Sequence, residues 1–249
     1  MGIPIKNPKE IEKMRAAGRI VALTLVELEK HITIGITTKV LDELAEKFIL
    51  SQDAKPNFKN YKGFPASSCI SVNDTVIHGI PNDYALQNGD IVSIDLGAVK
   101  DGYHGDAART FTVGTVSKEA IRLIDTTKEC FFEGLNQARA GRRVGDISAA
   151  IQLHAEKYGY SVVRNYCGHG IGKRLHEDPS IPNHGSFGTG ALLKAGYTLA
   201  IEPMINFGSH HTIVANDKWT VKTQDGHLSA HYENTVLITH GDPEILTTV

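Results

Sequence analysis

Cysteine, net charge and long apolar runs are all scarce in this sequence, and each shortage excludes a class of protein. The three cysteines, Cys69, Cys130 and Cys167, form no Cys-x-x-Cys pair, which argues against a disulfide scaffold or a zinc ribbon and favours a reducing, cytoplasmic location. The 249 residues carry a formal net charge of −2 without a basic block, so we predict no specific nucleic-acid or membrane binding. No apolar run is long enough to span a bilayer, and residues 1–10 lack the apolar core of a signal peptide.

A pair of helices is predicted at the start of the chain. The first is well marked, because Asn7 is a favourable N-cap, Pro8 occupies the first helical position and Glu10 can close a capping box. The second should begin near Thr37. It is expected to place Leu41, Leu44 and Phe48 on one face.

A second pair of helices is predicted further along. Ser117 is expected to cap one helix and Asp146 the helix that follows it. The first of these helices is expected to carry Ile121, Ile124, Phe131 and Leu135.

The two parts of the chain resemble each other. After each helix pair the sequence has a glycine, a run of strand-forming residues and then a carboxylate, over residues 89–95 and 196–202. We infer a diverged internal duplication in a single catalytic domain, with halves at approximately 5–114 and 117–240. Two α+β halves would bring their strands together and leave their helices outside. Chance similarity of two helix–helix–strand units is the alternative.

Asp95 and Asp106 flank a predicted hairpin. Residues 91–96 and 107–113 are rich in strand formers, and residues 100–102 read Lys-Asp-Gly, a turn signal. If the chain reverses there, the two aspartates lie opposite each other with Cβ atoms about 5 Å apart. Carboxylates that close repel each other unless one is protonated or a cation lies between them. The alternative is a solvated surface pair, but Asp95 ends an apolar strand, where an uncompensated charge is costly.

Two glutamates have similar surroundings. Glu202 lies within an apolar run over residues 198–205, while Glu233 follows a hairpin signal at Asp225 and Gly226 and precedes a strand predicted over residues 235–238. Either glutamate alone could form a structural ion pair. Four acidic groups at strand ends in matched halves are better explained by a shared cation site.

His169 is surrounded by three glycines, at positions 168, 170 and 172. We expect these glycines to let the backbone adopt unusual angles and approach a ligand closely. A phosphate-binding loop is the alternative, but no helix with the required Lys-Ser or Lys-Thr follows.

One imidazole and four carboxylates form an oxygen-rich, negatively charged set. Such a set suits two divalent first-row ions bridged by carboxylates better than one structural zinc. Paired ions generate a hydroxide nucleophile and polarise a carbonyl group. Because no Gly-x-Ser-x-Gly motif is present and no cysteine stands beside a convincing base, we predict a metal-dependent hydrolase.

With these residues identified, the sequence resembles the bacterial type I methionine aminopeptidases of peptidase family M24, from about residue 3 to residue 245. The motifs that carry the resemblance lie at 63–67, 69–73, 78–81, 95–97, 104–106, 168–172, 176–177, 201–203 and 232–235. The resemblance implies an α+β, pita-bread fold, in which two pseudo-symmetric halves form a central antiparallel sheet with helices outside.

The same resemblance implies a set of metal ligands. In the family pattern, the residue matching Asp95 is bidentate to one ion, Asp106 and Glu233 match the bridging carboxylates, and His169 and Glu202 match ligands of the second ion. Two divalent ions, chosen from Co, Mn, Fe, Zn and Ni, are therefore implied.

Further residues acquire roles from the resemblance. His78 is similar to the histidine beside the amide nitrogen of the scissile bond, and His176 to the one that hydrogen-bonds the scissile carbonyl. Leu175 departs from the family, which usually has an aromatic residue there, and this affects the shape of the pocket rather than the chemistry. The implied methionine pocket is lined by Tyr61, Phe64, Cys69 and Trp219. The positions that match a monovalent-cation site are Asn73, Thr75 and Ser229.

The activity implied is removal of the initiator methionine from nascent polypeptides whose second residue is small. The substrate amine would bind one ion, a metal-bridging hydroxide would attack the first peptide bond, and Glu202 would handle the proton. The resemblance also implies a cytoplasmic monomer whose partners are nascent N-termini, with a transient ribosome contact.

Three alternatives compete with this interpretation. A prolidase or aminopeptidase P shares the fold but generally carries a substantial N-terminal domain, for which a helix beginning near Pro8 leaves no room. A non-enzymatic relative would have lost ligands, whereas this chain keeps all five and both histidines. A ribosome-docking protein would need an RNA-binding stripe, which the modest net charge does not provide.

Overall fold

The computed structural model describes residues 2–249. Its α-helices are α1 (Pro8–Glu29), α2 (Thr38–Ser51), α3 (Lys118–Gln137) and α4 (Val144–Lys157), and a short 3-10 helix covers Tyr61–Gly63. The strands of the first part are β1 (Lys55–Pro56), β2 (Ser68–Val72), β3 (Thr75–Ile77), β4 (Ile91–Lys100) and β5 (Tyr103–Thr112). Those of the second part are β6 (Ser161–Val162), β7 (Cys167–Gly170), β8 (Glu177–Pro182), β9 (Thr198–Ile201), β10 (Met204–Asn206), β11 (Thr212–Val214), β12 (Val221–Thr223), β13 (Ser229–His231), β14 (Asn234–Leu237) and β15 (Glu244–Ile245).

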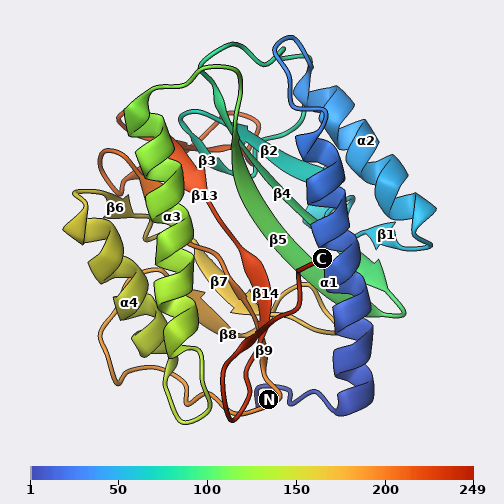
Figure 1. The fold of residues 1–249 in the computed structure, drawn as a ribbon, viewed down its shortest axis with the longest axis vertical. Coiled ribbons are helices and arrows are strands. Elements are labelled where there is room, and N and C mark those ends of the chain that lie inside the picture. Colours follow the sequence, from blue (N-terminus) through green and yellow to red (C-terminus); the bar gives the residue numbers. More distant parts are fainter. Residues whose placement is uncertain (1) are drawn as a thin grey trace.

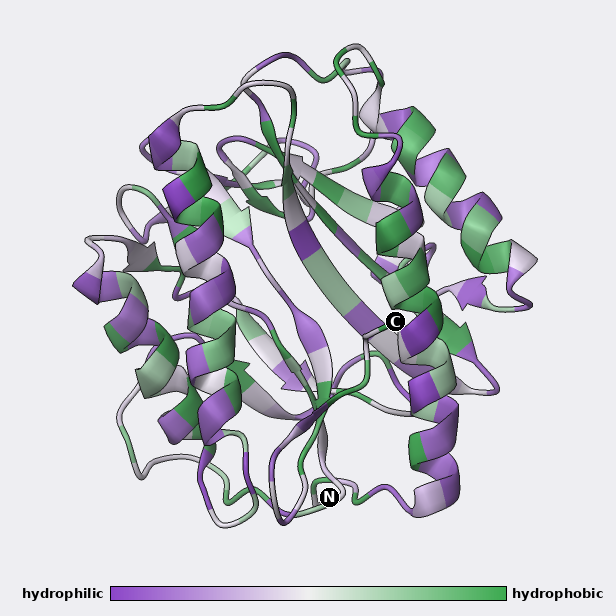
Figure 2. Ribbon diagram, viewed as in Figure 1, coloured by the Kyte–Doolittle hydropathy of each residue, from purple (hydrophilic) through white to green (hydrophobic). Residues whose placement is uncertain are grey.

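The helices lie in two pairs on the two sides of the strands. Figure 1 shows α1 and α2 on the right and α3 and α4 on the left, with β4, β5, β9 and β14 between them. Figure 2 shows hydrophilic and hydrophobic residues alternating around each helix, as expected for helices with one face on a core. No helix among residues 2–249 combines the length and apolarity needed to cross a membrane.

The start of α1 is as predicted. The Asn7 side chain accepts a hydrogen bond from the backbone N–H of Glu10 at 3.1 Å, and the Glu10 carboxylate accepts one from the N–H of Asn7 at 2.9 Å. Pro8 is the first helical residue. The capping box and the proline therefore define this end of the helix from the local sequence.

The residues expected on α2 and α3 are buried to different extents. In α2 the fully buried row is Leu41, Ala45 and Ile49, a four-residue spacing that faces α1 and β2, whereas Leu44 and Phe48 are only half-buried. In α3 the N-cap is Ser117, as predicted. Ile121, however, is 46% exposed, while Phe131 and Leu135 are buried.

Asp146 is not the N-cap of α4. Arg143 occupies that position, and Asp146 lies in the first turn. Its carboxylate accepts hydrogen bonds from the backbone N–H groups of Arg143 and Gly188, both at 2.7 Å. An acidic residue is favourable both at the N-cap and in the first turn, because at either position its carboxylate can accept hydrogen bonds from free N–H groups near the positive end of the helix dipole.

All strand pairings found among residues 2–249 are antiparallel, as predicted, but the ladders fall into four groups. The groups are β1-β4-β2 with β5 on β4, β13-β10-β6, β11-β12-β3, and β15-β14-β9-β7-β8. The hairpin predicted at Asp225 and Gly226 is wrong, because β12 pairs with β11 and β3 while β13 pairs with β10.

The buried side chains form separate cores under the two helix pairs. One core packs α1 and α2 against β2 and β4, and another packs α3 and α4 against β9 and β14. A third cluster, which includes Met14, Phe64 and Leu175, lies next to the candidate site. The internal duplication stays a prediction, although a helix pair followed by strands occurs in each half.

Candidate metal centre

The β4–β5 hairpin carries Asp95 and Asp106 on one face. Its turn uses left-handed backbone conformations, with φ of 49° at Asp101 and 77° at Gly102. This turn sets a register in which Asp95 pairs with Ala108, two residues beyond Asp106. The prediction that the aspartates lie directly opposite each other is therefore wrong. They are diagonal neighbours, and side chains at diagonal positions on one face still come close to each other.

Glu233 reaches the site from a segment that runs beside β5. Its backbone N–H donates to the carbonyl of Ala108 at 3.0 Å, and the N–H of Ala108 donates to the carbonyl of Glu233 at 3.4 Å. Nearby, the Thr235 hydroxyl accepts from the N–H of Asp106 at 3.0 Å and donates to its carbonyl at 2.9 Å. These bonds hold Glu233 next to Asp106 although the two are far apart in sequence.

Arg109 fixes the same segment without neutralising the Glu233 carboxylate. Its guanidinium donates to the carbonyl of Glu233 at 2.6 Å and to the side-chain oxygen of Asn234 at 2.7 Å, and it lies 4.2 Å from the Tyr232 ring centroid. Because this cation contacts the backbone rather than the carboxylate, the charge of Glu233 stays available to a ligand.

Glu202 faces Glu233 across the next ladder. Strands β9 and β14 pair Ile201 with Asn234, the residues that come directly before Glu202 and directly after Glu233. The carbonyl of Glu202 accepts a hydrogen bond from the Asn183 side chain at 3.0 Å. The pairing therefore places the two glutamates at matching positions.

The glycines around His169 serve close packing rather than unusual backbone angles. Strand β7 is extended, and neither Gly168 nor Gly170 has a positive φ, which corrects the prediction. A Cβ atom at Gly168 would overlap the carbonyl oxygen of Ala200, and one at Gly170 would overlap that of Asp178. Glycine is needed here because β8 and β9 approach β7 too closely for a side chain.

The ring of His169 is held with one nitrogen facing the carboxylates. Its Nδ1–H donates to the carbonyl of Gly170 at 2.9 Å, so Nε2 carries the lone pair. This Nε2 lies 3.6 Å from Glu202 Oε1 and 4.0 Å from Asp106 Oδ2. A backbone partner that fixes the tautomer in this way is typical of metal-ligating histidines.

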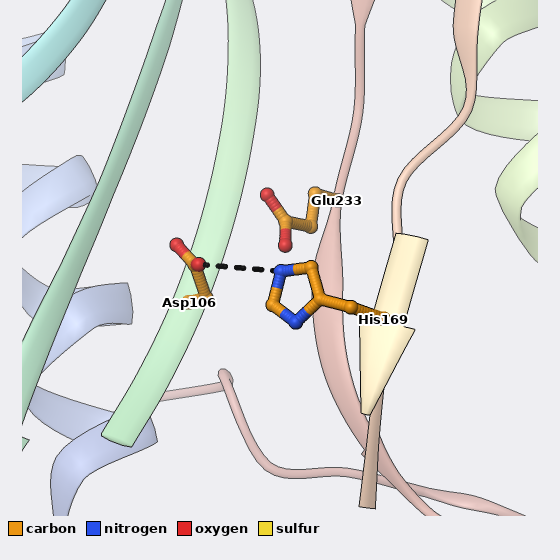
Figure 3. Close-up of side chains that lie close together, drawn as sticks. All are labelled: Asp106, His169 and Glu233. Carbon is orange, nitrogen blue, oxygen red and sulfur yellow. Dashed lines mark ion pairs between the residues drawn. The ribbon is translucent and has the colours of Figure 1, made fainter. Parts of the chain in front are cut away.

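Three of these side chains converge on one point. Figure 3 shows Asp106 from β5, His169 from β7 and Glu233 from the segment before β14 pointing toward one another. One ligand atom from each of the three lies within 4.8 Å of the others. All three residues are buried, with Asp106 3% and Glu233 2% exposed.

Three of the carboxylates each have a buried oxygen without a partner among residues 2–249. Asp95 Oδ1, Asp106 Oδ1 and Glu233 Oε1 are buried without a hydrogen bond. Burial raises the pKa of Asp95 to about 8. Burial and repulsion from neighbouring carboxylates also raise the pKa values of Asp106, Glu202 and Glu233 well above their usual range.

This donor set fits divalent metal ions. Unpartnered, buried carboxylate oxygens are costly without a cation. Four carboxylates and one neutral imidazole match the oxygen and nitrogen donors that first-row divalent ions accept. Burial lowers the pKa of His169 to about 4, so its Nε2 is free of a proton and able to ligate at neutral pH.

His78 and His176 both lie at the same cavity as the carboxylates. His78 has a φ of 58° and packs edge-on against Tyr166 and Trp219, and burial lowers its pKa to about 4. His176 is exposed, and its ring centroid lies 4.1 Å from that of His169. Loss of hydration, together with the neighbouring His169, lowers the pKa of His176 to about 3.

Tyr61 holds His176 in place. The Tyr61 hydroxyl and His176 Nδ1 share a hydrogen bond of 2.8 Å, and the two rings stack with an interplanar angle of 17°. The orientation of the His176 ring is therefore fixed, with Nδ1 toward Tyr61.

A cavity of about 200 Å³ opens next to the carboxylates. Leu175, the residue that departs from the family pattern, is buried in its wall. The four residues predicted to line the methionine pocket are all in the wall: Tyr61, Phe64, Cys69 and Trp219. Apolar walls beside a polar cluster are the usual form of a site for a small apolar side chain.

The residues predicted to hold a monovalent cation are near one another but already have partners. The Asn73 side chain donates to Asp90 at 2.8 Å and accepts from the N–H of Ile91 at 3.0 Å. The N–H of Ser229 donates to the carbonyl of Asn73 at 2.9 Å. Thr75 pairs in β3 with β12. The monovalent site stays a prediction.

Three residues at this site were not predicted from the sequence. Phe58 and Lys62 line the cavity. His231 is 2% exposed, and its Nε2 lies 4.0 Å from Glu202 Oε2. The signal for His231 was strand alternation, since a residue two positions from Glu233 in an extended segment points to the same face.

Known proteins resemble this chain over nearly its whole length. Residues 12–240 match the family model described as Metallopeptidase family M24. The methionine aminopeptidase of Clostridium acetobutylicum is 55% identical over 246 residues, covering 98% of each chain. The crystal structure of methionine aminopeptidase from Rickettsia prowazekii superposes with a TM-score of 0.98 at 47% identity, covering 99% of this chain and 100% of that one.

A more distant neighbour shares the fold alone. Prolidase from Pyrococcus furiosus has a TM-score of 0.81 at 24% identity, and the match covers 98% of this chain and 65% of that one. The expected pita-bread fold is confirmed by these neighbours. The chain belongs to metallopeptidase family M24 and, within it, to the methionine aminopeptidases.

Proposed function

We propose that this protein is a metal-dependent aminopeptidase that removes the N-terminal methionine of polypeptides whose second residue is small. The observation that carries the proposal is the cluster of buried, unpaired carboxylate oxygens facing His169 Nε2 beside an apolar cavity. The proposed metal ligands are Asp95, Asp106, His169, Glu202 and Glu233. Family membership supports the use of divalent metal.

The proposal includes two divalent ions, chosen from Co, Mn, Fe, Zn and Ni. Four carboxylates provide more oxygen donors than one ion with a histidine ligand needs, which favours a pair bridged by carboxylates. When bound, such ions lower the pKa of water and polarise a carbonyl group. Cellular availability selects among ions that a carboxylate-rich site accepts.

The chain's own residues would bind and orient the substrate. The methionine side chain would occupy the cavity walled by Tyr61, Phe64, Cys69 and Trp219. His78, which lines the same cavity, would hydrogen-bond the amide nitrogen of the scissile bond. If the Tyr61 hydroxyl donates to His176 Nδ1, then His176 Nε2–H donates to the scissile carbonyl oxygen, where negative charge develops.

Glu202 would move the proton. Its carboxylate lines the cavity, and a positioned carboxylate can act first as a general base and then as a general acid. It would accept a proton from water and deliver it to the departing amine nitrogen. Proton transfer of this kind typically contributes a factor of about 10² to 10⁴ in rate.

The proposal extends to partners and location. The substrates would be the N-termini of nascent polypeptides, and the protein would act as a monomer in the cytoplasm, with a transient contact to the ribosome. The net charge of −2 and the three unpaired cysteines are compatible with this setting.

The test is turnover of a Met-Ala-Ser peptide by protein stripped of metal and reloaded with each ion in turn. We expect at least one ion to restore activity, and His169→Ala and Asp106→Ala to abolish it. His154→Ala is the matched control, because His154 pairs with Glu129 outside the cavity. Near-native turnover by either site variant would contradict the proposal, as would preference for an Xaa-Pro dipeptide.

A further inference from the structure

His231 is a buried polar residue that the proposed mechanism does not use. It ends β13 and is 2% exposed. Its Nε2 has no hydrogen-bond partner among the described residues. An imidazole nitrogen left unpaired in the interior is destabilising, so a partner for this atom is expected when the protein is functional.

The backbone of His231 is fixed. Its N–H donates to the Thr110 hydroxyl at 3.0 Å, and its carbonyl accepts from the same hydroxyl at 2.9 Å. In the β10–β13 ladder it pairs with Met204, two residues beyond Glu202. The imidazole is therefore on the same face as the Glu202 carboxylate, and local strand pairing prevents it from turning away.

Glu202 lies between two imidazoles. Its Oε1 is 3.6 Å from His169 Nε2, and its Oε2 is 4.0 Å from His231 Nε2. Both separations are too long for a direct hydrogen bond. A carboxylate that ligates metal through one oxygen is usually held by a hydrogen bond on the other, and His231 is the group in position to supply it.

We propose that His231 is a positioning residue that donates a hydrogen bond from Nε2–H to Glu202 Oε2 and so keeps Oε1 turned toward His169. This inference rests on the proposed function of Glu202 as a metal ligand. It predicts that His231 tightens metal binding without ligating the ion itself.

The test compares three variants of the full chain by calorimetric titration of metal-stripped protein with Mn²⁺. His231→Leu removes the donor, and His231→Gln retains an N–H donor. Met204→Leu perturbs the packing opposite His231, where Met204 is fully buried, without removing a hydrogen bond. We expect about 10- to 100-fold weaker binding for the leucine variant of His231, and binding within about threefold of native for the other two.

A second measurement separates positioning from ligation. The visible absorption of the Co²⁺-loaded protein reports the atoms that ligate the ion, so it should be the same in native protein and in His231→Gln. Loss of affinity in His231→Gln equal to that in His231→Leu, with a changed spectrum, would overturn the inference and make His231 a ligand.

Two further outcomes are decisive. Native-like Mn²⁺ affinity in a folded His231→Leu variant would leave His231 a packing role only and overturn the inference while the proposed function stands. Failure of the native protein to bind Mn²⁺ or Co²⁺ would overturn the proposed function, and this inference with it.

Discussion

Metal-free protein should become less stable as the pH rises above 7. The metal-free site holds four carboxyls whose pKa values are raised in the fold, and for Asp95 the value is about 8. At a pH between the pKa of such a carboxyl in the unfolded chain and its pKa in the fold, the folded state keeps a proton that the unfolded chain has released. Stability is then greatest at low pH and is lost as the pH rises toward the folded pKa.

The size of the effect follows from the number of protons retained. Each carboxyl that stays protonated in the fold lowers the free energy of unfolding by about 1.4 kcal/mol per pH unit. For a chain of this length that corresponds to a fall in the melting temperature of about 3–6 °C per pH unit.

The pH range of the test must be one in which no other titrating group contributes to the change in stability. Below about pH 6.5, histidines with lowered pKa values oppose the effect, because the unfolded chain protonates them first. These are His78, His104, His169, His176, His210 and His231. Above about pH 8, the buried thiols of Cys69 and Cys130, whose pKa values are raised, begin to add to it. The informative range is therefore pH 7 to 8.

The assay is thermal unfolding, followed by circular dichroism, of metal-stripped and Mn²⁺-loaded protein at several pH values in this range. Loaded protein should show the opposite slope, because the ligands must be deprotonated to bind metal and bound metal stabilises the fold. A melting temperature of the stripped protein that is flat or rises from pH 7 to 8 would refute the reasoning.

Three further predictions test individual side chains. Asp106→Asn should raise the free energy of unfolding of metal-free protein by about 1–3 kcal/mol at pH 8 while abolishing metal binding. Asp90→Asn should instead lower the free energy of unfolding by about 1–3 kcal/mol, because the Asp90 carboxylate accepts hydrogen bonds from Asn73, Tyr84 and Gln87. Urea unfolding measures both variants, and shifts of the same sign would contradict the assignment of Asp106. Tyr61→Phe should lower kcat/KM on Met-Ala-Ser about tenfold with Mn²⁺ affinity unchanged, because it removes only the hydroxyl that orients His176; unaltered turnover would count against that role. Gly168→Ala should cost about 1–3 kcal/mol of stability, because the added Cβ meets the carbonyl of Ala200, and a neutral result in urea unfolding would show that β7 and β9 can separate.

Features that depend on neighbouring residues in the chain were predictable. The start of α1 needs only Asn7, Pro8 and Glu10, all within one turn. The cap of α3 by Ser117 is equally local. The four carboxylates among the proposed ligands were also identifiable, because a carboxylate at the end of an apolar strand is costly unless it has a partner.

The exact register of the β4–β5 strand pair was not predictable from the sequence. Asp95 and Asp106 share a face as expected, but the turn at Asp101 and Gly102 pairs Asp95 with Ala108. A two-residue shift keeps the same face, so alternation along the strand cannot detect it. The glycines beside His169 were misread for a related reason, because the constraint on them comes from Ala200 and strands that pack against β7 from elsewhere in the chain.

The amino-acid sequence alone therefore identified the chemistry of this protein, because the types of metal-ligating side chain and their apolar neighbours can be recognised from consecutive residues. Only the tertiary structure decided which donors meet. Thr235 holds Asp106, Tyr61 orients His176, and His231 faces Glu202. Each of these relations depends on segments that are distant along the chain and are brought together by strand pairing and packing, which no local pattern encodes.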